Sequence, residues 1–222
     1  MPARPPTSRS KPWPASRAIR LGSTDPGAFN DRGNVLRNLQ RADAALQSFD
    51  RAIDLRPDYA EAYSNRGNAL YDLGRSPEAL ASYARAIALR RDYAEAFNHR
   101  GNALHDLDRL QEALASYAQA LALRPDYLDA LANRAGVLSV LGQRAAALQS
   151  DDQALALQPN HPAAHFGRSG CMLQQGDFAR GWAEYEWRWR MPRQTERAGR
   201  LAQPPWLGAE PLAGKTILLH AE

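Results

Sequence analysis

The chain has 222 residues, of which 44% are hydrophobic and 23% are charged, and its formal net charge is +4. It contains no apolar run of the roughly 18 residues that a membrane-spanning helix needs, so we expect no membrane partner. Its one cysteine, Cys171, excludes an internal disulfide and favours a reducing compartment such as the cytoplasm.

The excess of positive charge lies at the start of the chain. Five of the 28 basic residues but one of the 24 acidic residues fall within residues 1–25, so the remainder carries no net charge. The charge therefore does not belong to a folded basic face, and we expect no nucleic-acid partner. Residues 1–25 are rich in Pro, Ser and Arg without apolar periodicity, which predicts a disordered tail. A flexible leader or a misassigned start of the sequence is favoured over a targeting segment.

Arginine recurs every 34 residues along most of the chain. The members of this series are Arg32, Arg66, Arg100, Arg134 and Arg168. A fixed period of 34 residues is typical of a tandem helical repeat, so it predicts an all-α solenoid of helix pairs. We expect four units at 26–59, 60–93, 94–127 and 128–161, followed by a degenerate fifth unit or adaptor at 162–192.

Each unit is expected to hold two antiparallel helices, A and B, joined by a short turn. Asp25 before Pro26 predicts the start of the first A helix, because proline needs no hydrogen-bond partner at the first helical position. Asp58 with Glu61 predicts a capping box at the start of the second A helix, and Asp92 with Glu95 repeats it.

Small residues have predicted structural roles within each unit. Gly74, Gly142 and Gly176 fall in the turns between helices A and B, where a residue of positive φ ends a helix. Gly67 on helix A and Ala79 on helix B are expected where the two helices approach most closely, with bulky residues filling the space around them.

Together these residues resemble the tetratricopeptide repeat. An aromatic residue at the fourth position, Gly at the eighth, Leu at the eleventh, Ala at the twentieth and Tyr at the twenty-fourth form its pattern, with Ala and Pro at the twenty-seventh and thirty-second. The first three units match closely, the fourth has Asp151 in place of the tyrosine, and the fifth is degenerate. The resemblance implies a right-handed superhelix whose A helices line a concave groove.

Polar positions on the A helices that packing leaves unused should face this groove. Many are asparagines, whose carboxamides both donate and accept hydrogen bonds and suit the backbone of an extended peptide. The predicted groove residues are Asp31, Asn34, Asn38, Glu61, Asn65, Asn68, Asp72, Glu95, His99, Asn102, Asp106 and Asn133. The alternative interpretation is a solvated polar face that binds nothing.

A second resemblance concerns the segment AYSNRGNAL at 62–70. It is similar to the repeats of protein O-linked N-acetylglucosamine transferases, in which an asparagine at the position of Asn65 and Asn133 contacts the substrate backbone. Asp31 and His99 stand at that position in the first and third units, so the ladder is incomplete.

The arginine series has two interpretations. In the first, the aliphatic stems pack and the guanidinium groups pair with carboxylates, for which Asp58, Asp92 and Asp126 recur at the same period. In the second, the arginines form a column that binds phosphate or carboxylate. The packing interpretation is favoured.

No metal or cofactor site is predicted. His161 and His165 have the spacing of a helical metal pair, but no acid or cysteine completes a ligand set near them, and a role at the helix terminus is favoured. Gly214-Lys215-Thr216 lacks the earlier glycine and the following helix of a phosphate-binding loop.

Residues 193–222 are expected to form a linker and one buried strand, and a lone strand is not stable by itself. The segment GDFARGWAEYEWRWR at 176–190, with PPWLG and PLAGKTILLHAE after it, resembles the junction at which a bacterial repeat array meets a glycosyltransferase domain. The stripe of Trp182, Tyr185 and Trp189 is expected to be a packing face.

Two functional hypotheses follow from the sequence. The first is a protein-interaction module that binds an extended peptide or a partner protein in the asparagine-lined groove. The second is the substrate-recognition part of a protein glycosyltransferase whose catalytic domain would follow residue 222. No catalytic residue is predicted within the chain, and the sequence does not indicate an oligomeric state.

Overall fold

A computed structural model describes residues 24–191 of the chain, and every regular element in this range is helical. The predicted tail, apart from its last two residues, and the predicted linker and strand at 193–222 lie outside the described residues. The described chain divides into two compact units, the first ending at Pro125 and the second beginning at Asp126.

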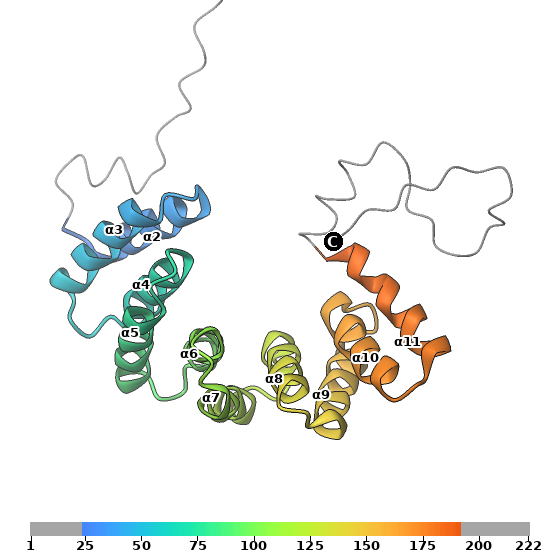
Figure 1. Ribbon diagram of the computed structural model, residues 1–222. Coiled ribbons are helices and arrows are strands. Elements are labelled where there is room, and N and C mark those ends of the chain that lie inside the picture. The colour runs from blue at the N-terminus through green and yellow to red at the C-terminus, as the bar shows by residue number, and fades with distance from the viewer. Residues whose placement is uncertain (1–23, 192–222) are drawn as a thin grey trace, which may run out of the picture. The chain divides into compact units, whose positions relative to one another are not determined.

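The first unit consists of three helix pairs, shown from blue to green in Figure 1. They are α2 (Pro26–Asn38) with α3 (Ala42–Leu55), α4 (Ala60–Asp72) with α5 (Ser76–Leu89), and α6 (Ala94–Asp106) with α7 (Leu110–Leu123). Within this unit each second helix also contacts the first helix of the next pair, and α4 contacts both α2 and α6. The helices α2, α4 and α6 therefore form one layer, in which side chains of successive pairs come together.

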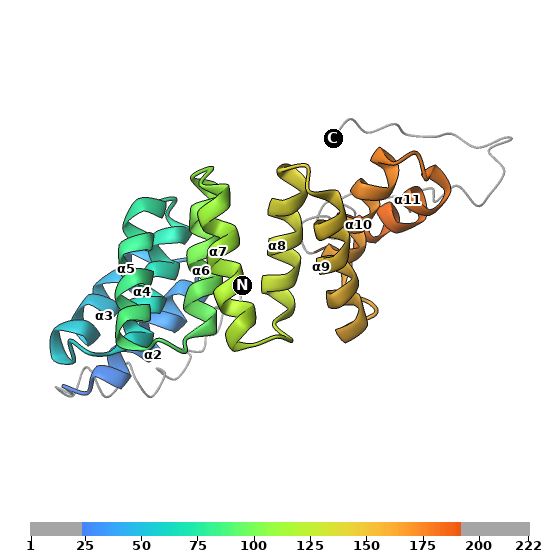
Figure 2. The ribbon, with the colours of Figure 1, turned by 90° about the horizontal axis from the view of Figure 1, so that it is seen from below.

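The second unit begins with α8 (Leu128–Val140), α9 (Arg144–Leu157) and α10 (Pro162–Gln174). It continues with α11 (Phe178–Tyr185) and a single 3₁₀ segment, η1 (Glu186–Arg190), shown in orange in Figures 1 and 2. Helix α10 contacts α8, α9, α11 and η1, so it is the central element of this unit. No helix within residues 24–191 is long and apolar enough to cross a membrane.

The turns within the helix pairs confirm the role predicted for three glycines. Gly74, Gly142 and Gly176 have φ values of 72°, 71° and 82°, a conformation that glycine adopts without steric cost. Gln40 and Asp108 take the same conformation in the corresponding turns of the first and third pairs, with φ values of 58° and 57°. The turn geometry is thus retained even where the chain has no glycine.

The predicted capping boxes are wrong, whereas the cap of the first helix is confirmed. Asp25 accepts hydrogen bonds from the backbone N–H groups of Gly27 and Ala28, with Pro26 at the first helical position. Helix α4 instead begins after Tyr59, whose side chain makes no cap hydrogen bond. Glu61 does not cap the helix because its carboxylate pairs with an arginine, as described below.

The close approach predicted for Gly67 is made by an aromatic ring. A Cβ atom added at Gly67 would lie 2.5 Å from Cε1 of Tyr83, which reaches over from α5. Gly33 and Gly101 bear the same relation to Phe49 and Tyr117, with corresponding distances of 2.4 Å in both cases. The glycines therefore make room for a ring from the second helix of the same pair, sixteen residues later in the sequence.

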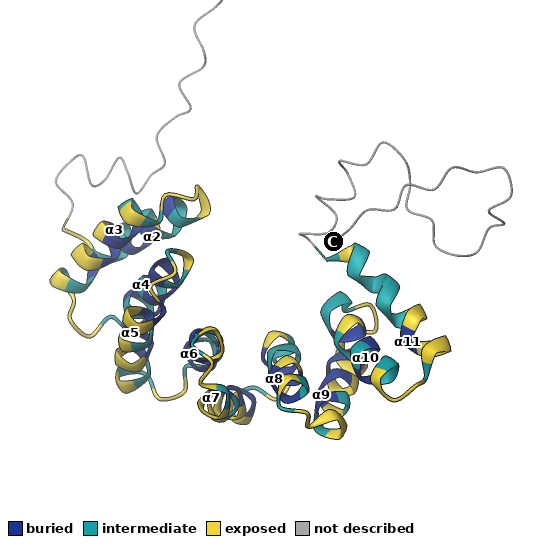
Figure 3. Cartoon of the chain, viewed as in Figure 1, coloured by how far each residue is buried: buried dark blue, intermediate teal, exposed yellow. Residues whose placement is uncertain are grey.

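Burial follows from this arrangement (Figure 3). Phe49, Tyr83 and Tyr117 are at most 1% exposed, and Ala45, Ala79 and Ala113 are fully buried beside them. A small residue on one helix and a ring on its partner fill the space between the two without leaving a void, which is the condition for a stable core.

We predict that Gly67→Ala lowers the free energy of unfolding by about 1–3 kcal/mol, because the new methyl group would displace the Tyr83 ring. The control is Gly136→Ala on α8, where an added Cβ meets nothing within 4 Å. This control should leave stability unchanged or raise it by up to about 1 kcal/mol, since alanine favours helix more than glycine. Urea denaturation measures both, and a Gly67→Ala variant as stable as the parent would contradict the packing account.

Candidate functional site

Two asparagines of the first unit are held by buried tyrosines. The hydroxyl of Tyr83 donates a hydrogen bond to Oδ1 of Asn68 at 2.9 Å, and the hydroxyl of Tyr117 donates to Oδ1 of Asn102 at 2.8 Å. Burial raises the pKa of both tyrosines above the ordinary value, so the hydroxyls keep their protons. Each asparagine therefore has its carbonyl oxygen occupied, while its Nδ2 group still carries two N–H donors.

These asparagines lie on the wall of a small cavity between α4, α5 and α6. Its volume is about 170 Å³, and its lining consists of Arg37, Asn68, Tyr71, Asp72, Tyr83, His99 and Asn102. Arg37 Nε and Asp72 Oδ2 form an ion pair of 2.8 Å beside it. The His99 ring lies 5.9 Å from the Tyr83 ring, measured between centroids. We call this cavity the Asn68–Asn102 pocket.

The pocket contains four of the residues predicted for the groove, namely Asn68, Asp72, His99 and Asn102. It also contains three that were not predicted. Tyr83, at the twenty-fourth position of the second unit, is expected from the repeat pattern to pack between helices, but its hydroxyl also donates a hydrogen bond to Asn68. Arg37 and Tyr71 stand at the same position of successive units, 34 residues apart, next to the predicted polar face. That shared position was the signal that could have identified them.

Other predicted residues are engaged within the protein. Glu61 forms an ion pair with Arg90, and Glu95 forms one with Arg124, at the end of the second helix of the same pair. Asn65 donates from Nδ2 to Oδ1 of Asn30 at 2.9 Å, which links α4 to α2. The carboxylates of Glu61 and Glu95 thus connect the two helices of the second and third pairs. We therefore do not include them among the groups that bind a ligand.

The remaining predicted residues do not line the Asn68–Asn102 pocket. Asp31, Asn34 and Asn38 lie on α2, and Asp106 lies at the end of α6. Asn133 lies on α8, in the second unit. The structure therefore brings together a third of the predicted groove residues around one cavity and distributes the others along the helices.

The arginine series is part of the packing between helices. Three of its members donate to a serine sixteen residues later: Arg66 to Ser82 at 2.8 Å, Arg100 to Ser116 at 3.1 Å, and Arg134 to Ser150 at 3.0 Å. Each serine donates its own hydroxyl proton to a backbone carbonyl one turn earlier. The predicted partners Asp58, Asp92 and Asp126 are wrong, because the carboxylates that these arginines contact lie on helices and not in the loops: Arg66 pairs with Asp50, and Arg168 pairs with Asp152 and Glu184.

The fourth helix pair departs from the packing of the first three. Ala135 stands where the earlier pairs have glycine, and Asp151 stands where they have an aromatic residue. The two changes belong together, since the added methyl group would occupy the space of a ring. Asp151 is only 1% exposed, and its Oδ2 atom has no hydrogen-bond partner among the described residues. Burial, and to a lesser degree the neighbouring Asp152, raise the pKa of this carboxyl to about 7.

We predict that Asp151 makes the protein more stable in acid than in mild base. Its pKa in the folded protein, about 7, is higher than the ordinary value of 3.8. The stabilisation from its bound proton is therefore complete below about pH 4 and is lost as the pH rises through 7. Between about pH 5 and pH 8 the loss should be on the order of 2 kcal/mol.

Thermal or urea denaturation of the parent and of Asp151→Asn at several pH values measures this effect. The variant keeps the size of the side chain and lacks the titrating group, so its stability should vary less over this range. A parent and a variant with parallel pH dependence would contradict the assignment.

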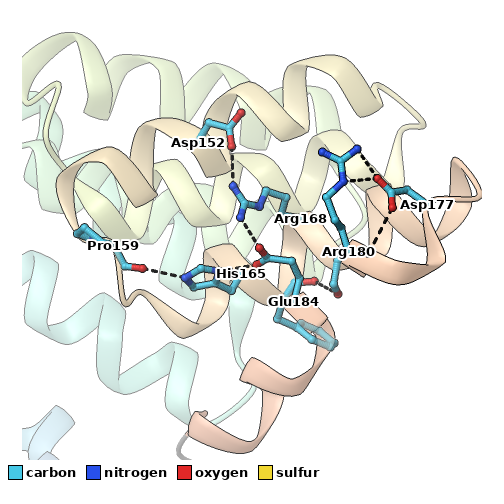
Figure 4. A network of polar contacts seen from close by, with 9 residues as sticks. Asp152, Pro159, His165, Arg168, Asp177, Arg180 and Glu184 are labelled. Carbon is cyan, nitrogen blue, oxygen red and sulfur yellow. Dashed lines mark hydrogen bonds and ion pairs between the residues drawn. The ribbon is translucent and has the colours of Figure 1, made fainter. Parts of the chain in front are cut away.

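The fifth helix pair is held by a polar network that Figure 4 shows from close by. His165 on α10 pairs through Nδ1 with Glu184 on α11, and its Nε2 lies 2.8 Å from the carbonyl oxygen of Pro159. Arg168 bridges Glu184 to Asp152 on α9. The ring of His165 stacks on Trp187 of η1 at 3.8 Å. These contacts fix α11 and η1 against α10, so the histidine has a structural role in this pair.

His165 on α10 and His161, the N-cap residue of that helix, both have hydrogen-bond partners within the protein. Within residues 24–191 no group of three or more His, Cys, Asp or Glu side chains is placed to hold a metal ion. His161 acts at a helix terminus, as expected, because its Nδ1 accepts from the backbone N–H of Ala164 at 3.3 Å. Helix α11 ends at Tyr185, so Trp189 of the predicted aromatic stripe lies in η1 instead.

Comparison with known proteins decides the family. Models described as TPR repeat or tetratricopeptide repeat match residues 33–74, 67–108, 94–127 and 135–186, which together cover more than half of the chain. The chain is a tetratricopeptide repeat protein. Its helix pairs are therefore TPR units of an α-solenoid, and the ring-on-glycine contact is the packing of the repeat signature. No curated protein matches the sequence.

Solved structures of TPR proteins resemble this one. YrrB, described as a TPR protein with an unusual peptide-binding site, is 19% identical with a TM-score of 0.63, over 85% of this chain and 99% of that one. A thermophilic TPR protein of Thermus thermophilus is 26% identical with a TM-score of 0.63, over 79% and 92%. The first TPR of Spaghetti (RPAP3), bound to the HSP90 peptide SRMEEVD, is 26% identical with a TM-score of 0.52, over 54% and 95%.

Proposed function

We propose that this TPR protein is an interaction module that binds an extended peptide segment of a partner along the layer of α2, α4 and α6. The observation that carries the proposal is the hydrogen bond from each buried tyrosine to an asparagine oxygen. It holds the side chains of Asn68 and Asn102 in one orientation and leaves the Nδ2 groups as donors. Carbonyl oxygens of a peptide backbone are the acceptors that such donors match.

The hydrogen bonds from the tyrosines also restrict the motion of the Asn68 and Asn102 side chains. Asn68 is 9% exposed and its carboxamide is held by Tyr83, so little side-chain entropy remains to be lost when a ligand binds. Arg37 and Asp72, which also line the Asn68–Asn102 pocket, form an ion pair and present one charge of each sign. A peptide is therefore held mainly through its backbone in this region, and the cavity has room for a side chain.

The comparison with Spaghetti supports the proposal, because that TPR structure contains a bound peptide and is 26% identical to this chain. We place the protein in the cytoplasm, with the free and buried thiol of Cys171 as the supporting observation. The neutral charge balance outside residues 1–25 supports a protein partner and not a nucleic acid.

We predict that Asn68→Ala combined with Asn102→Ala weakens peptide binding by about tenfold or more, because two N–H donors to the peptide are lost. Peptides selected on an array with the parent protein serve as ligands, and fluorescence anisotropy gives the dissociation constants.

The matched control is Tyr83→Phe combined with Tyr117→Phe. It removes the same two internal hydrogen bonds but keeps both Nδ2 donors, so it should weaken binding less than the alanine variant does, through the lost orientation of the asparagines alone. Equal affinities of the parent and the double alanine variant would eliminate the asparagine-lined groove. A control that loses as much affinity as the alanine variant would show that the effect comes from the lost internal hydrogen bonds and not from the Nδ2 donors.

The alternative is that the chain is the substrate-recognition part of a protein glycosyltransferase. It rests on the sequence of 176–190 and of two later blocks within 204–222, which resemble the junction with a catalytic domain. The later blocks lie outside the described residues. The coding sequence after residue 222 tests this alternative: a reading frame that continues into a glycine-rich loop favours it, and a stop codon without a separate catalytic gene opposes it.

A further inference from the structure

In the second unit, the positions equivalent to those that line the Asn68–Asn102 pocket carry different residues. A shift of two 34-residue steps takes the positions that line the Asn68–Asn102 pocket from α4, α5 and α6 to α8, α9 and α10. These three helices contact one another, as α4, α5 and α6 do. In this register Asn68 corresponds to Gly136, Tyr83 to Asp151, His99 to Gly167 and Asn102 to Gly170.

Three of the four side chains are therefore missing from the second unit. A Cβ atom added at Gly136 or at Gly170 would meet nothing within 4 Å, so the space that asparagine side chains fill in the first unit is open here. Gly136 is exposed, and Gly167 and Gly170 are half-buried. Bare backbone of α8 and α10 thus borders this space on two sides.

The carboxyl group of Asp151 lies directly beneath this surface. A Cβ atom added at Gly167 would lie 2.9 Å from Oδ2 and 3.1 Å from Oδ1 of Asp151, so the carboxyl faces that glycine. The side chain is 1% exposed, and Oδ2 has no hydrogen-bond partner among the described residues. A buried carboxylate without a partner is costly, and a cation that reaches it recovers that cost.

The charged and titratable neighbours of Asp151 do not supply such a cation. Asp152 on α9 disfavours the ionised carboxyl, and Cys171 on α10 is buried close to it. Arg168 on α10 favours the ionised form, but its two Nη atoms pair with Asp152 and Glu184, and its buried Nε has no hydrogen-bond partner among the described residues. On α8, the neutral Ser139 hydrogen-bonds to Cys171. No metal-binding group of three ligands exists within residues 24–191, so a metal ion does not suit the position.

We propose that the surface of Gly136, Gly167 and Gly170 above Asp151 is a subsite for a lysine side chain of a partner peptide that binds the second unit. The inference rests on the proposed peptide-binding function and adds a preference for one side chain. The aliphatic stem of the lysine lies along the bare backbone of α8 and α10. The Asp151 carboxylate turns from beneath Gly167 toward the open space and accepts a charge-assisted hydrogen bond from the ammonium group.

The test compares two alanine-based peptides that differ at one position, lysine in one and norleucine in the other. Norleucine has the same stem without the charge, so the ratio of the two dissociation constants isolates the ammonium group. With the full-length protein the lysine peptide should bind about tenfold more tightly. The preference should grow from about pH 6 to about pH 8, as Asp151 loses its proton in the free protein.

Three variants complete the experiment. Asp151→Asn should remove the preference, while Asp129→Asn, the same change at an exposed residue of α8, should keep it. Gly170→Asn restores the side chain that the first unit has at this position and should block the subsite by filling it. Circular dichroism verifies that each variant is folded, and Gly170→Asn provides the answer if Asp151→Asn is not.

The outcomes separate this inference from the proposed function. If both peptides bind equally well to the parent, or if Asp151→Asn and Gly170→Asn keep the lysine preference, the subsite is overturned and the groove remains. If neither peptide binds the parent at any position of the lysine, the groove and the subsite both fall. A lysine preference that the Asn68→Ala, Asn102→Ala variant retains supports the subsite independently of the groove.

Discussion

In each of the first three helix pairs an aromatic ring lies directly on a glycine of the partner helix, and the rest of the structure depends on this contact. The distances of 2.4–2.5 Å from a hypothetical Cβ atom to the ring leave no space for any side chain at Gly33, Gly67 or Gly101. The same rings bury the alanines around them. In two pairs the ring is a tyrosine whose hydroxyl orients an asparagine, so the contact that packs the repeat also fixes the direction of two side-chain amides.

The fourth pair lacks this contact and packs in another way. With Ala135 and Asp151 in place of glycine and an aromatic residue, the packing persists without a ring, and a buried carboxyl takes its position. The surrounding positions change together with it, since Gly136, Gly167 and Gly170 replace the polar side chains of the first unit. One repeat scaffold therefore presents amide donors in one unit and a carboxylate under bare backbone in the other.

The periodic features of the sequence were sufficient to predict the repeat, the helix pairs and the glycine turns, because these depend on local conformation and on packing that recurs at a fixed step. Asn68 and Asn102 were identified from the same period. The partners of charged side chains were not, since Glu61 pairs with Arg90 and Arg66 with Ser82 across distances in the sequence that only the helix crossing determines. Asp151 was visible as a departure from the pattern, but its burial required the structure.

The central claim is that the Nδ2 groups of Asn68 and Asn102 donate hydrogen bonds to a bound peptide, while their Oδ1 atoms keep accepting from the tyrosine hydroxyls. The most direct measurement is the titration of a binding peptide into the protein, followed through the side-chain amide NMR signals of these two asparagines. The account predicts that both pairs of signals shift and saturate together with the peptide. Saturable binding that leaves both unchanged and perturbs residues of α3, α5 and α7 instead would contradict it.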